Sequence, residues 1–390
     1  PLVITGAART PMGGFQGCLS GATAPELGAK AIKAAMDRAA VVPEEVDEVF
    51  MGCVLPAGLG QAPARQAALG GGLTLATGCT TINKMCGSGM KAAMLAHDLL
   101  RAGTAKIIVA GGMESMTNAP YLMDKARSGY RMGHGKVIDH MFLDGLEDAY
   151  DKGRLMGTYA EDCAESYQFT RESQDAFAIE SLTRARKAID DGTFSKEVSP
   201  VVIKDRKGQT TVRHDEQPGK ANLEKIPTLK PAFREGGTVT PANSSSISDG
   251  AAALVLMSEK QAAKRGLQPL ARIIAHATHA QAPALFTTAP VGAMKKLFEV
   301  TGWKPEEVDL FEVNEAFAVV TMAAMRELGL PRDKVNVHGG ACALGHPIGA
   351  SGARILVTLL AALEKYDLKR GIASLCIGGG EATAMALERL

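Results

Sequence analysis

Cys86 lies in the stretch TINKMCGSGMKAAMLAHDLL, residues 81–100, directly before a Gly-Ser-Gly turn. The residues after it carry apolar side chains at helical spacing, so we expect a helix that begins near Ser88. The free N–H groups and the dipole at a helix start stabilise a thiolate, and glycines let backbone N–H groups approach a substrate carbonyl. Cys86 is therefore a candidate nucleophile. The alternative is a small buried side chain, the more common role of a single cysteine.

His346 is a candidate base for this cysteine. It lies between Gly345 and Pro347 in HGGACALGHPIGASGARI, a loop that directly precedes another predicted helix. Its place in the C-terminal part of the chain is equivalent to that of the Cys86 turn, so the two residues would face each other if two similar halves pack about a pseudo-twofold axis. The imidazole could then remove the Cys86 proton. The alternative is a solvated loop histidine.

Two further residues end apolar stretches. Cys376 in SLCIGGG precedes three glycines, which suggests a ligand that approaches the backbone, although core packing is the simpler interpretation of a cysteine there. Asn314 in VNEAFAVV could cap a helix, or its amide could orient a water or a developing oxyanion.

The elements that must position these residues occur twice. VPEEVDEVFMG at residues 42–52 returns as KPEEVDLFEVN at residues 304–314, and each copy predicts a helix start followed by a strand. Ser88 matches Ser351, and the strand IIVAGGMES matches SLCIGGGEA, all in the same order. Three ordered matches predict a duplicated α/β fold with a mostly parallel or mixed sheet covered by helices.

The segment between the copies differs in character. It contains polar, turn-rich stretches and, in residues 160–192, two predicted amphipathic helices. We therefore expect an N-terminal half, an inserted loop domain and a C-terminal half, over residues 1–118 with 250–268, 119–249 and 269–390. A chain of 390 residues is long enough for more than one core.

Composition narrows the classes of function. A net charge of +1 provides no overall field for nucleic acid or a membrane surface, and no long apolar run predicts a membrane span. The seven cysteines form no CxxC pair, which favours a reducing, cytoplasmic setting over disulfides or zinc. Motifs for nucleotide hydrolysis and metal catalysis do not occur. Residues 204–234 carry eight Lys or Arg against four acids, which predicts either a solvated face or a site for a phosphorylated ligand.

Six motifs together resemble the thiolases over the whole chain: NKMCGSGMKA, VAGGMESMTNAP, TVTPANSSSISDGAA, VNEAFA, GGACALGHPIGASGAR and LCIGGGEATAM. The resemblance implies a duplicated five-layered α-β-α-β-α fold with an inserted loop domain that binds coenzyme A and makes oligomer contacts. It also implies reversible Claisen condensation of two acetyl-CoA to acetoacetyl-CoA and CoA, without a metal or other cofactor, by a homotetramer.

The resemblance assigns roles to particular residues. Cys86 would be the acyl-accepting nucleophile, His346 its base, Cys376 the second acid/base, and Asn314 the residue that orients a water in one oxyanion hole. The N–H groups of Cys86 and Gly378 would form the other hole. Coenzyme A contacts would come from Leu146, Met156, Phe233, Ser245, Ala316 and Phe317.

One position departs from the resemblance. Leu155 stands where many bacterial biosynthetic members have a histidine, so a 3-ketoacyl-CoA thiolase with broader chain-length range is the alternative. A catalytically silent protein on the same scaffold would be expected to lack at least one of the four reactive side chains, and all four are present.

Overall fold

The computed structural model describes residues 1–206 and 208–390, so Lys207, one of the cations counted above, lies outside the described residues. Its largest sheet is mixed and has ten strands, in the order β12-β13-β14-β11-β1-β10-β5-β3-β4, with β2 paired to β10. The bounds of these strands are β1 Leu2–Arg9, β2 Gly13–Gly14, β3 Glu48–Gly52, β4 Gly78–Ile82, β5 Ile107–Ser115, β10 Ser248–Ser258, β11 Ala271–Ala280, β12 Leu310–Val313, β13 Arg370–Ile377 and β14 Glu381–Arg389.

The sheet contains the predicted duplication. β3 pairs with β5 in parallel, and β5, β10 and β1 then follow as antiparallel neighbours. In the second half β12, β13, β14 and β11 repeat this sequence of one parallel and two antiparallel pairings. The halves join where the start of β1 pairs with the start of β11. The duplication inferred from three short matches is therefore confirmed at the level of topology.

The repeated Pro-Glu-Glu-Val-Asp motif makes equivalent hydrogen bonds in both halves. Pro43–Glu45 and Pro305–Glu307 form 3₁₀ turns, not the helix starts that we expected. The carboxylate of Asp47 accepts two successive backbone N–H groups at the start of β5, at 2.7 and 3.1 Å. The carboxylate of Asp309 accepts the equivalent pair at the start of β13, at 2.9 and 2.8 Å. Each motif thus anchors the start of a central strand in its own half, β5 or β13.

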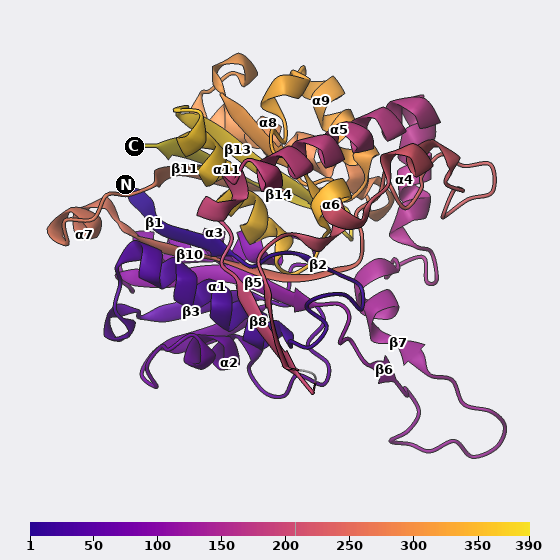
Figure 1. Cartoon of the computed structure of the whole chain (residues 1–390), viewed down its shortest axis with the longest axis horizontal. Coiled ribbons are helices and arrows are strands. Elements are labelled where there is room, and N and C mark those ends of the chain that lie inside the picture. The colour runs from indigo at the N-terminus through magenta and orange to yellow at the C-terminus, as the bar shows by residue number, and fades with distance from the viewer. Residues whose placement is uncertain (207) are drawn as a thin grey trace.

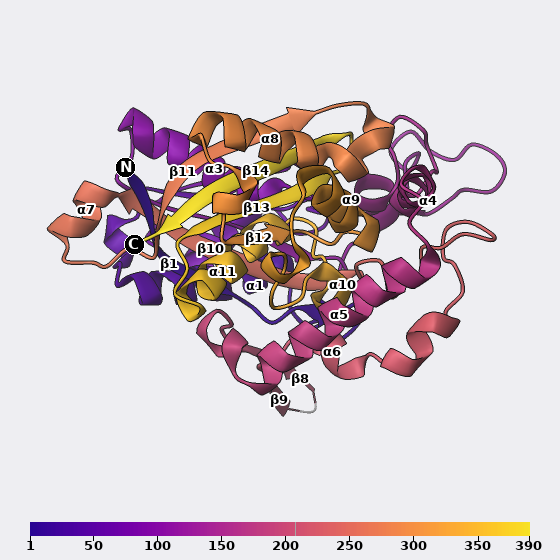
Figure 2. The same cartoon turned by 90° about the horizontal axis from the view of Figure 1, so that it is seen from above.

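Helices complete five layers, as predicted (Figures 1 and 2). The apolar faces of α1 and α2 cover one face of the N-terminal strands. α8 and α9 cover the outer face of the C-terminal strands. α3 and α11 lie between the two halves and share one core with the inner faces of both. The bounds are α1 Ala24–Ala39, α2 Pro63–Gly70, α3 Ser88–Ala102, α7 Glu259–Lys264, α8 Ala289–Thr301, α9 Ala318–Leu328, α10 Ala341–Leu344 and α11 Ser351–Lys365.

The two central helices touch near their N-termini. A Cβ added to Gly89 of α3 would lie 2.7 Å from the backbone nitrogen of Ala353, and one added to Gly352 of α11 would lie 2.4 Å from that of Met90. Only glycine permits this approach of two backbones. The contact brings the turn that carries Cys86 beside the loop that carries His346.

Residues 119–249 lie across one end of both halves and extend from it as a long loop (Figure 1). The two predicted amphipathic helices are present as α4 and α5. None of the helices in the described part of the chain has both the length and the apolar character that crossing a membrane requires. The division of the chain at residues 118 and 268 stays a prediction. The bounds within this segment are β6 Tyr121–Leu122, β7 Ile138–Asp139, α4 Met156–Ser166, α5 Arg171–Asp190, β8 Val201–Asp205, β9 Gly208–Val212 and α6 Glu216–Lys220.

Candidate active site

Cys86 is presented by a strained turn between β4 and α3. The preceding residue, Met85, has a φ angle of +48°, a backbone conformation that residues other than glycine rarely adopt. The hydroxyl of Ser88 donates to the carbonyl of Met85 at 2.6 Å and accepts the N–H of Lys84 at 2.8 Å. These bonds hold the sharp turn, and such strain is commonly found at functional sites.

The Cys86 thiol is protonated at neutral pH. Burial raises its pKa to about 11, although the N–H groups of Gly378 and of Cys86 itself favour the thiolate. The stabilisation expected from the start of α3 is therefore outweighed by desolvation, and the thiol needs a base before it can attack. A carbonyl bonded to this sulfur would bring its oxygen close to the same two N–H donors.

His346 is a neutral imidazole and can therefore act as such a base. Its Nδ1 lies 2.5 Å from the hydroxyl oxygen of Ser351, and that hydroxyl donates to the carbonyl of Pro347. The hydroxyl oxygen must therefore accept a hydrogen bond from Nδ1–H, which leaves the lone pair of the ring on Nε2. Burial lowers the pKa of His346 to about 3, so the ring is neutral. Nε2 is buried and has no hydrogen-bond partner among the described residues.

Asn314 follows β12 and does not cap the next helix, because the residue at the N-cap of α9 is Phe317. Its backbone N–H donates to the carbonyl of Ser374, and its Oδ1 accepts from Arg354 at 3.4 Å. Its Nδ2 is buried and lacks a hydrogen-bond partner within residues 1–206 and 208–390. A buried amide donor without a partner is costly, which indicates that a ligand or water is meant to accept from it.

Cys376 and Gly378 lie at the end of β13. Cys376 is buried, and burial raises the pKa of its thiol well above the ordinary range. A charge on Cys86 would raise that pKa further. A Cβ added to Gly378 would lie 3.7 Å from the sulfur of Met156, so the first residue of α4 faces this glycine turn.

Apolar side chains surround the two cysteines. Cys376 packs in one cluster with Met156, Phe233, Ala316 and Phe317. The rings of Phe233 and Phe317 meet edge to face, with centroids 6.0 Å apart. This cluster contains four of the six residues predicted to contact coenzyme A.

The other two predicted contact residues also lie near this site. Leu146 packs with Cys86 and Ile348 in a neighbouring apolar cluster. Ser245 donates both its N–H and its hydroxyl to the carbonyl of Ala316, each at 2.9 Å. The residues named from the sequence thus come together from both halves and the inserted segment.

Two family models cover almost the whole chain. The model described as thiolase, N-terminal domain, matches residues 2–260, and the model described as thiolase, C-terminal domain, matches residues 267–389. The chain belongs to the thiolase family.

Curated relatives and a solved structure agree with this assignment. An acetyl-CoA acetyltransferase of Escherichia coli (strain K12) is 51% identical over 391 residues, with 100% of this chain and 99% of the relative covered. A probable acetyl-CoA acetyltransferase of Dictyostelium discoideum is 50% identical, with 100% and 94% covered. The crystal structure of the Bacillus anthracis acetyl-CoA acetyltransferase superposes with a TM-score of 0.97 at 42% identity and covers 100% of this thiolase and 98% of that chain.

Three residues of this thiolase site were missed from the sequence. The carboxylate of Glu114 accepts N–H groups of Val54, Leu55 and Gly349, and burial raises its pKa to about 7. Ser351 orients His346, and Arg354 contacts Asn314. All three stand inside the motifs that carried the family resemblance. Their spacing alone gave no reason to select them. Glu114 and Arg354 contact residues distant in the chain, and the bond of Ser351 to His346, five residues earlier, depends on how the intervening loop folds.

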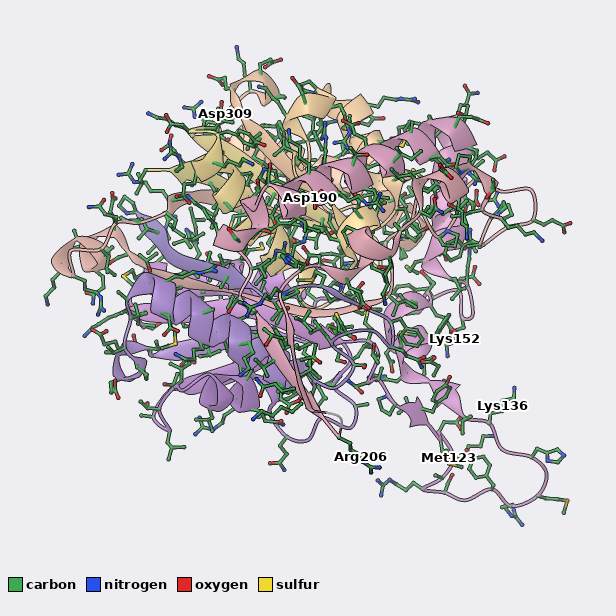
Figure 3. All side chains as sticks on the ribbon, viewed as in Figure 1. Met123, Lys136, Lys152, Asp190, Arg206 and Asp309 are labelled. Atoms are coloured by element: carbon green, nitrogen blue, oxygen red, sulfur yellow. The ribbon has the colours of Figure 1, made fainter. Side chains whose placement is uncertain are left out.

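Two cations of the basic segment are already paired. Arg234 pairs with Asp162 and Glu165 of α4, and Lys220 pairs with Glu216. Arg206 lies at the tip of the β8–β9 hairpin (Figure 3). The excess of cations between residues 204 and 234 is therefore partly neutralised by neighbouring carboxylates.

Leu155, the residue that departs from the resemblance, is the N-cap of α4 and forms an isolated β-bridge with Glu147. The bridge thus places Leu155 close to two predicted contact residues, because Leu146 precedes Glu147 in the chain and Met156 follows Leu155. Its side chain cannot supply the hydrogen bond that an imidazole could.

Proposed function

We propose that this thiolase condenses two acetyl-CoA to acetoacetyl-CoA and CoA, and catalyses the reverse thiolysis, through an acetyl group on Cys86. The observation that carries the proposal is the pair of buried atoms, Nε2 of His346 and Nδ2 of Asn314, that have no partner among the described residues and lie beside the half-buried thiol of Cys86 and the buried thiol of Cys376. The curated relatives, which are named acetyl-CoA acetyltransferases, support the acetyl group as substrate.

The first step transfers an acetyl group to the enzyme. Nε2 of His346 takes the proton of Cys86, and the thiolate attacks the carbonyl carbon of acetyl-CoA. The N–H groups of Cys86 and Gly378 stabilise the oxyanion of the tetrahedral intermediate. The carbon–sulfur bond to CoA breaks, Cys376 protonates the leaving thiolate, and free CoA departs.

The second step forms the carbon–carbon bond. The Cys376 thiolate removes an α-proton from a second acetyl-CoA, and His346, now protonated, and a water held by Asn314 stabilise the enolate oxygen. The enolate carbon attacks the acetyl carbonyl, and the Cys86 thiolate leaves and recovers its proton from His346. Since these side chains serve both proton transfers and both oxyanions, we propose that the reaction needs no metal or redox cofactor.

We further propose that Leu146, Met156, Phe233, Ser245, Ala316 and Phe317 contact coenzyme A or the acyl group. Met156 is central to this assignment because its sulfur faces Gly378, where the acyl group of the intermediate would lie. A bulky side chain there favours a short acyl chain. Leu155 favours the alternative, a thiolase for longer 3-ketoacyl-CoA, because it removes a polar contact.

Chain-length profiling separates these two functions. We expect kcat/KM for thiolysis of acetoacetyl-CoA to exceed that for C8 and C10 3-ketoacyl-CoA by roughly tenfold or more, because one misplaced methylene in a pocket already costs about 1–3 kcal/mol. Met156→Ala should narrow this ratio by enlarging the acyl site, with Val300→Ala as a control at an exposed apolar position of α8. A higher kcat/KM for C8 than for acetoacetyl-CoA would assign the protein to the alternative.

We propose that the protein is a homotetramer. β4 is an edge strand that pairs only with β3 among the described strands, and its backbone can pair with a second copy. The loop between β6 and β7 extends away from the body, with Met123 and Lys136 at its base (Figure 3). Large apolar side chains are exposed in and beside this loop: Tyr121, Met123, Met132 and Val137. Such a patch favours burial against another subunit.

The oligomeric state can be measured directly. We expect light scattering at micromolar concentration to give about four times the chain mass of 40.8 kDa. Met123→Glu with Val137→Glu should release dimers if the extended loop joins two pairs, whereas a doubly substituted control at the exposed Leu75 and Val300 should stay tetrameric. A wild-type mass near 41 kDa would contradict the proposal.

The setting that we propose is the cytoplasm, and the partners are acetyl-CoA, acetoacetyl-CoA and CoA, with no nucleic acid or membrane. The seven cysteines are free thiols, as a reducing compartment would keep them.

A further inference from the structure

Arg354 is a buried cation directly behind the candidate site. It lies on α11 with an exposed fraction of 1%, and its Nη2 donates to Oδ1 of Asn314 at 3.4 Å. Its Nη1 lies 3.7 Å from a carboxylate oxygen of Glu312, which is also buried. A buried charge of this kind is costly to keep, and a hydrophobic side chain of similar size would often be as stable. Stability therefore does not by itself explain an arginine here.

The chemistry of the guanidinium fixes the orientation of the amide. Arginine has five N–H donors and no acceptor, so only the oxygen of the Asn314 amide can face it. The NH₂ group must then point the other way, and it is this nitrogen that has no hydrogen-bond partner in the described part of the chain. If the amide turned over, its oxygen would face a developing oxyanion and repel it.

The same helix also orients His346. Ser351 holds Nδ1 of His346, and Arg354, three residues later on α11, holds Oδ1 of Asn314. Residues three apart lie on one face of a helix. One face of α11 thus binds Nδ1 of His346 and Oδ1 of Asn314. The other polar atom of each side chain, Nε2 of His346 and Nδ2 of Asn314, is left for the substrate. The positive charge of Arg354 also helps to keep His346 neutral.

We propose that Arg354 is a positioning residue that fixes the amide of Asn314 with its NH₂ group toward the enolate oxyanion hole. The inference rests on the proposed function, in which Asn314 serves that hole. Arg354 itself touches no reacting atom and acts through Asn314.

Three single variants and one double variant test this role. Arg354→Met removes the donor and lets the amide turn, whereas Arg354→Lys keeps a cation that can only donate. Asn314→Ala removes the amide, and Asn314→Ala with Arg354→Met closes a double-mutant cycle. Two readouts are needed: formation of acetyl-Cys86 from acetyl-CoA, and condensation to acetoacetyl-CoA.

Asn314→Ala should lower kcat for condensation by roughly 10²–10³-fold, the usual loss for one oxyanion donor. Arg354→Met should lower it by about tenfold or more, since the donor is then present but no longer held in place. Arg354→Lys should recover most of this loss, and acetyl-Cys86 should form at nearly the wild-type rate in both Arg354 variants. In the Asn314→Ala background, Arg354→Met should have little further effect.

A structural role would give a different pattern. It would lower both half-reactions alike, and it would add to the effect of Asn314→Ala; either result overturns the inference. If Arg354→Met does not fold because the carboxyl group of Glu312 is left without a partner, the double variant Arg354→Met with Glu312→Met removes both polar groups and can be tested in the same way. If Asn314→Ala lowered the rate of condensation but Arg354→Met did not, only this inference would be overturned. If Asn314→Ala left condensation unchanged, the proposed role of Asn314 would fail as well.

Discussion

Replacing Cys86 by serine is expected to lower acetyl transfer and condensation by about 10⁴-fold or more, the scale of loss when a catalytic nucleophile is removed. An alkoxide is far harder to form than a thiolate, and burial has already raised the pKa of the Cys86 thiol to about 11. The neutral His346 base cannot overcome the still higher pKa of a serine hydroxyl. The fold should be retained, because a hydroxyl is close in size to the thiol.

The measurement is recovery of labelled acetyl groups after incubation with radiolabelled acetyl-CoA and tryptic digestion. Label should appear on the peptide that contains Cys86 and should be lost in Cys86→Ser. Cys18→Ser is a matched control, since Cys18 is also a half-buried free thiol but lies outside the site clusters. Label on a different peptide in the wild type would remove Cys86 from the mechanism.

Cys376→Ser is expected to separate the two half-reactions. Condensation should fall by roughly 10²–10⁴-fold, the usual contribution of a general acid or base, because the α-proton of the second acetyl-CoA then has no thiolate to accept it. Acetylation of Cys86 should continue, since its nucleophile, its base and the two N–H donors remain. The released CoA thiolate can take its proton from solvent in this variant.

Rapid-quench measurement of acetyl-Cys86, beside steady-state condensation, tests this separation. A Cys163→Ser variant is a suitable comparison, because Cys163 is buried in the same apolar cluster as Cys376 but is placed on α4. Equal loss of both half-reactions in Cys376→Ser would contradict separate roles for the two cysteines.

The duplicated topology explains why the two halves supply different groups to one site. Each half begins a central helix with Ser-Gly, at Ser88 and Ser351. In the first copy the serine fixes the turn that presents Cys86, and in the second it fixes the tautomer of His346. Equivalent serines of the two halves thus orient the nucleophile, through Ser88, and its base, through Ser351.

The amino-acid sequence by itself determined the duplication, the five layers, the two helices of the insert and the residues gathered at the site. The duplication and the two helices depend on local patterns of apolar periodicity and turn residues, whereas the five layers and most of the site residues came from six motifs that resemble the thiolases. The sequence also led to two wrong expectations, a helix start at each Pro-Glu-Glu-Val-Asp and a thiolate stabilised by α3. In the folded chain the motif forms a 3₁₀ turn whose following aspartate anchors a distant strand in each half, and burial raises the pKa of the Cys86 thiol.

Only the tertiary structure decided which atoms of the site residues face the substrate. The lone pair is on Nε2 of His346 because Ser351 and Pro347 close a hydrogen-bond chain around Nδ1. The free amide donor of Asn314 is set by Arg354, 40 residues along the chain, and the loop before α11 is tied to Glu114, 235 residues before it. Such contacts form between residues whose spacing in the sequence carries no periodic signal. The contact of Glu114 with Gly349 also requires the packing of the two halves, in which the central helices meet at Gly89 and Gly352.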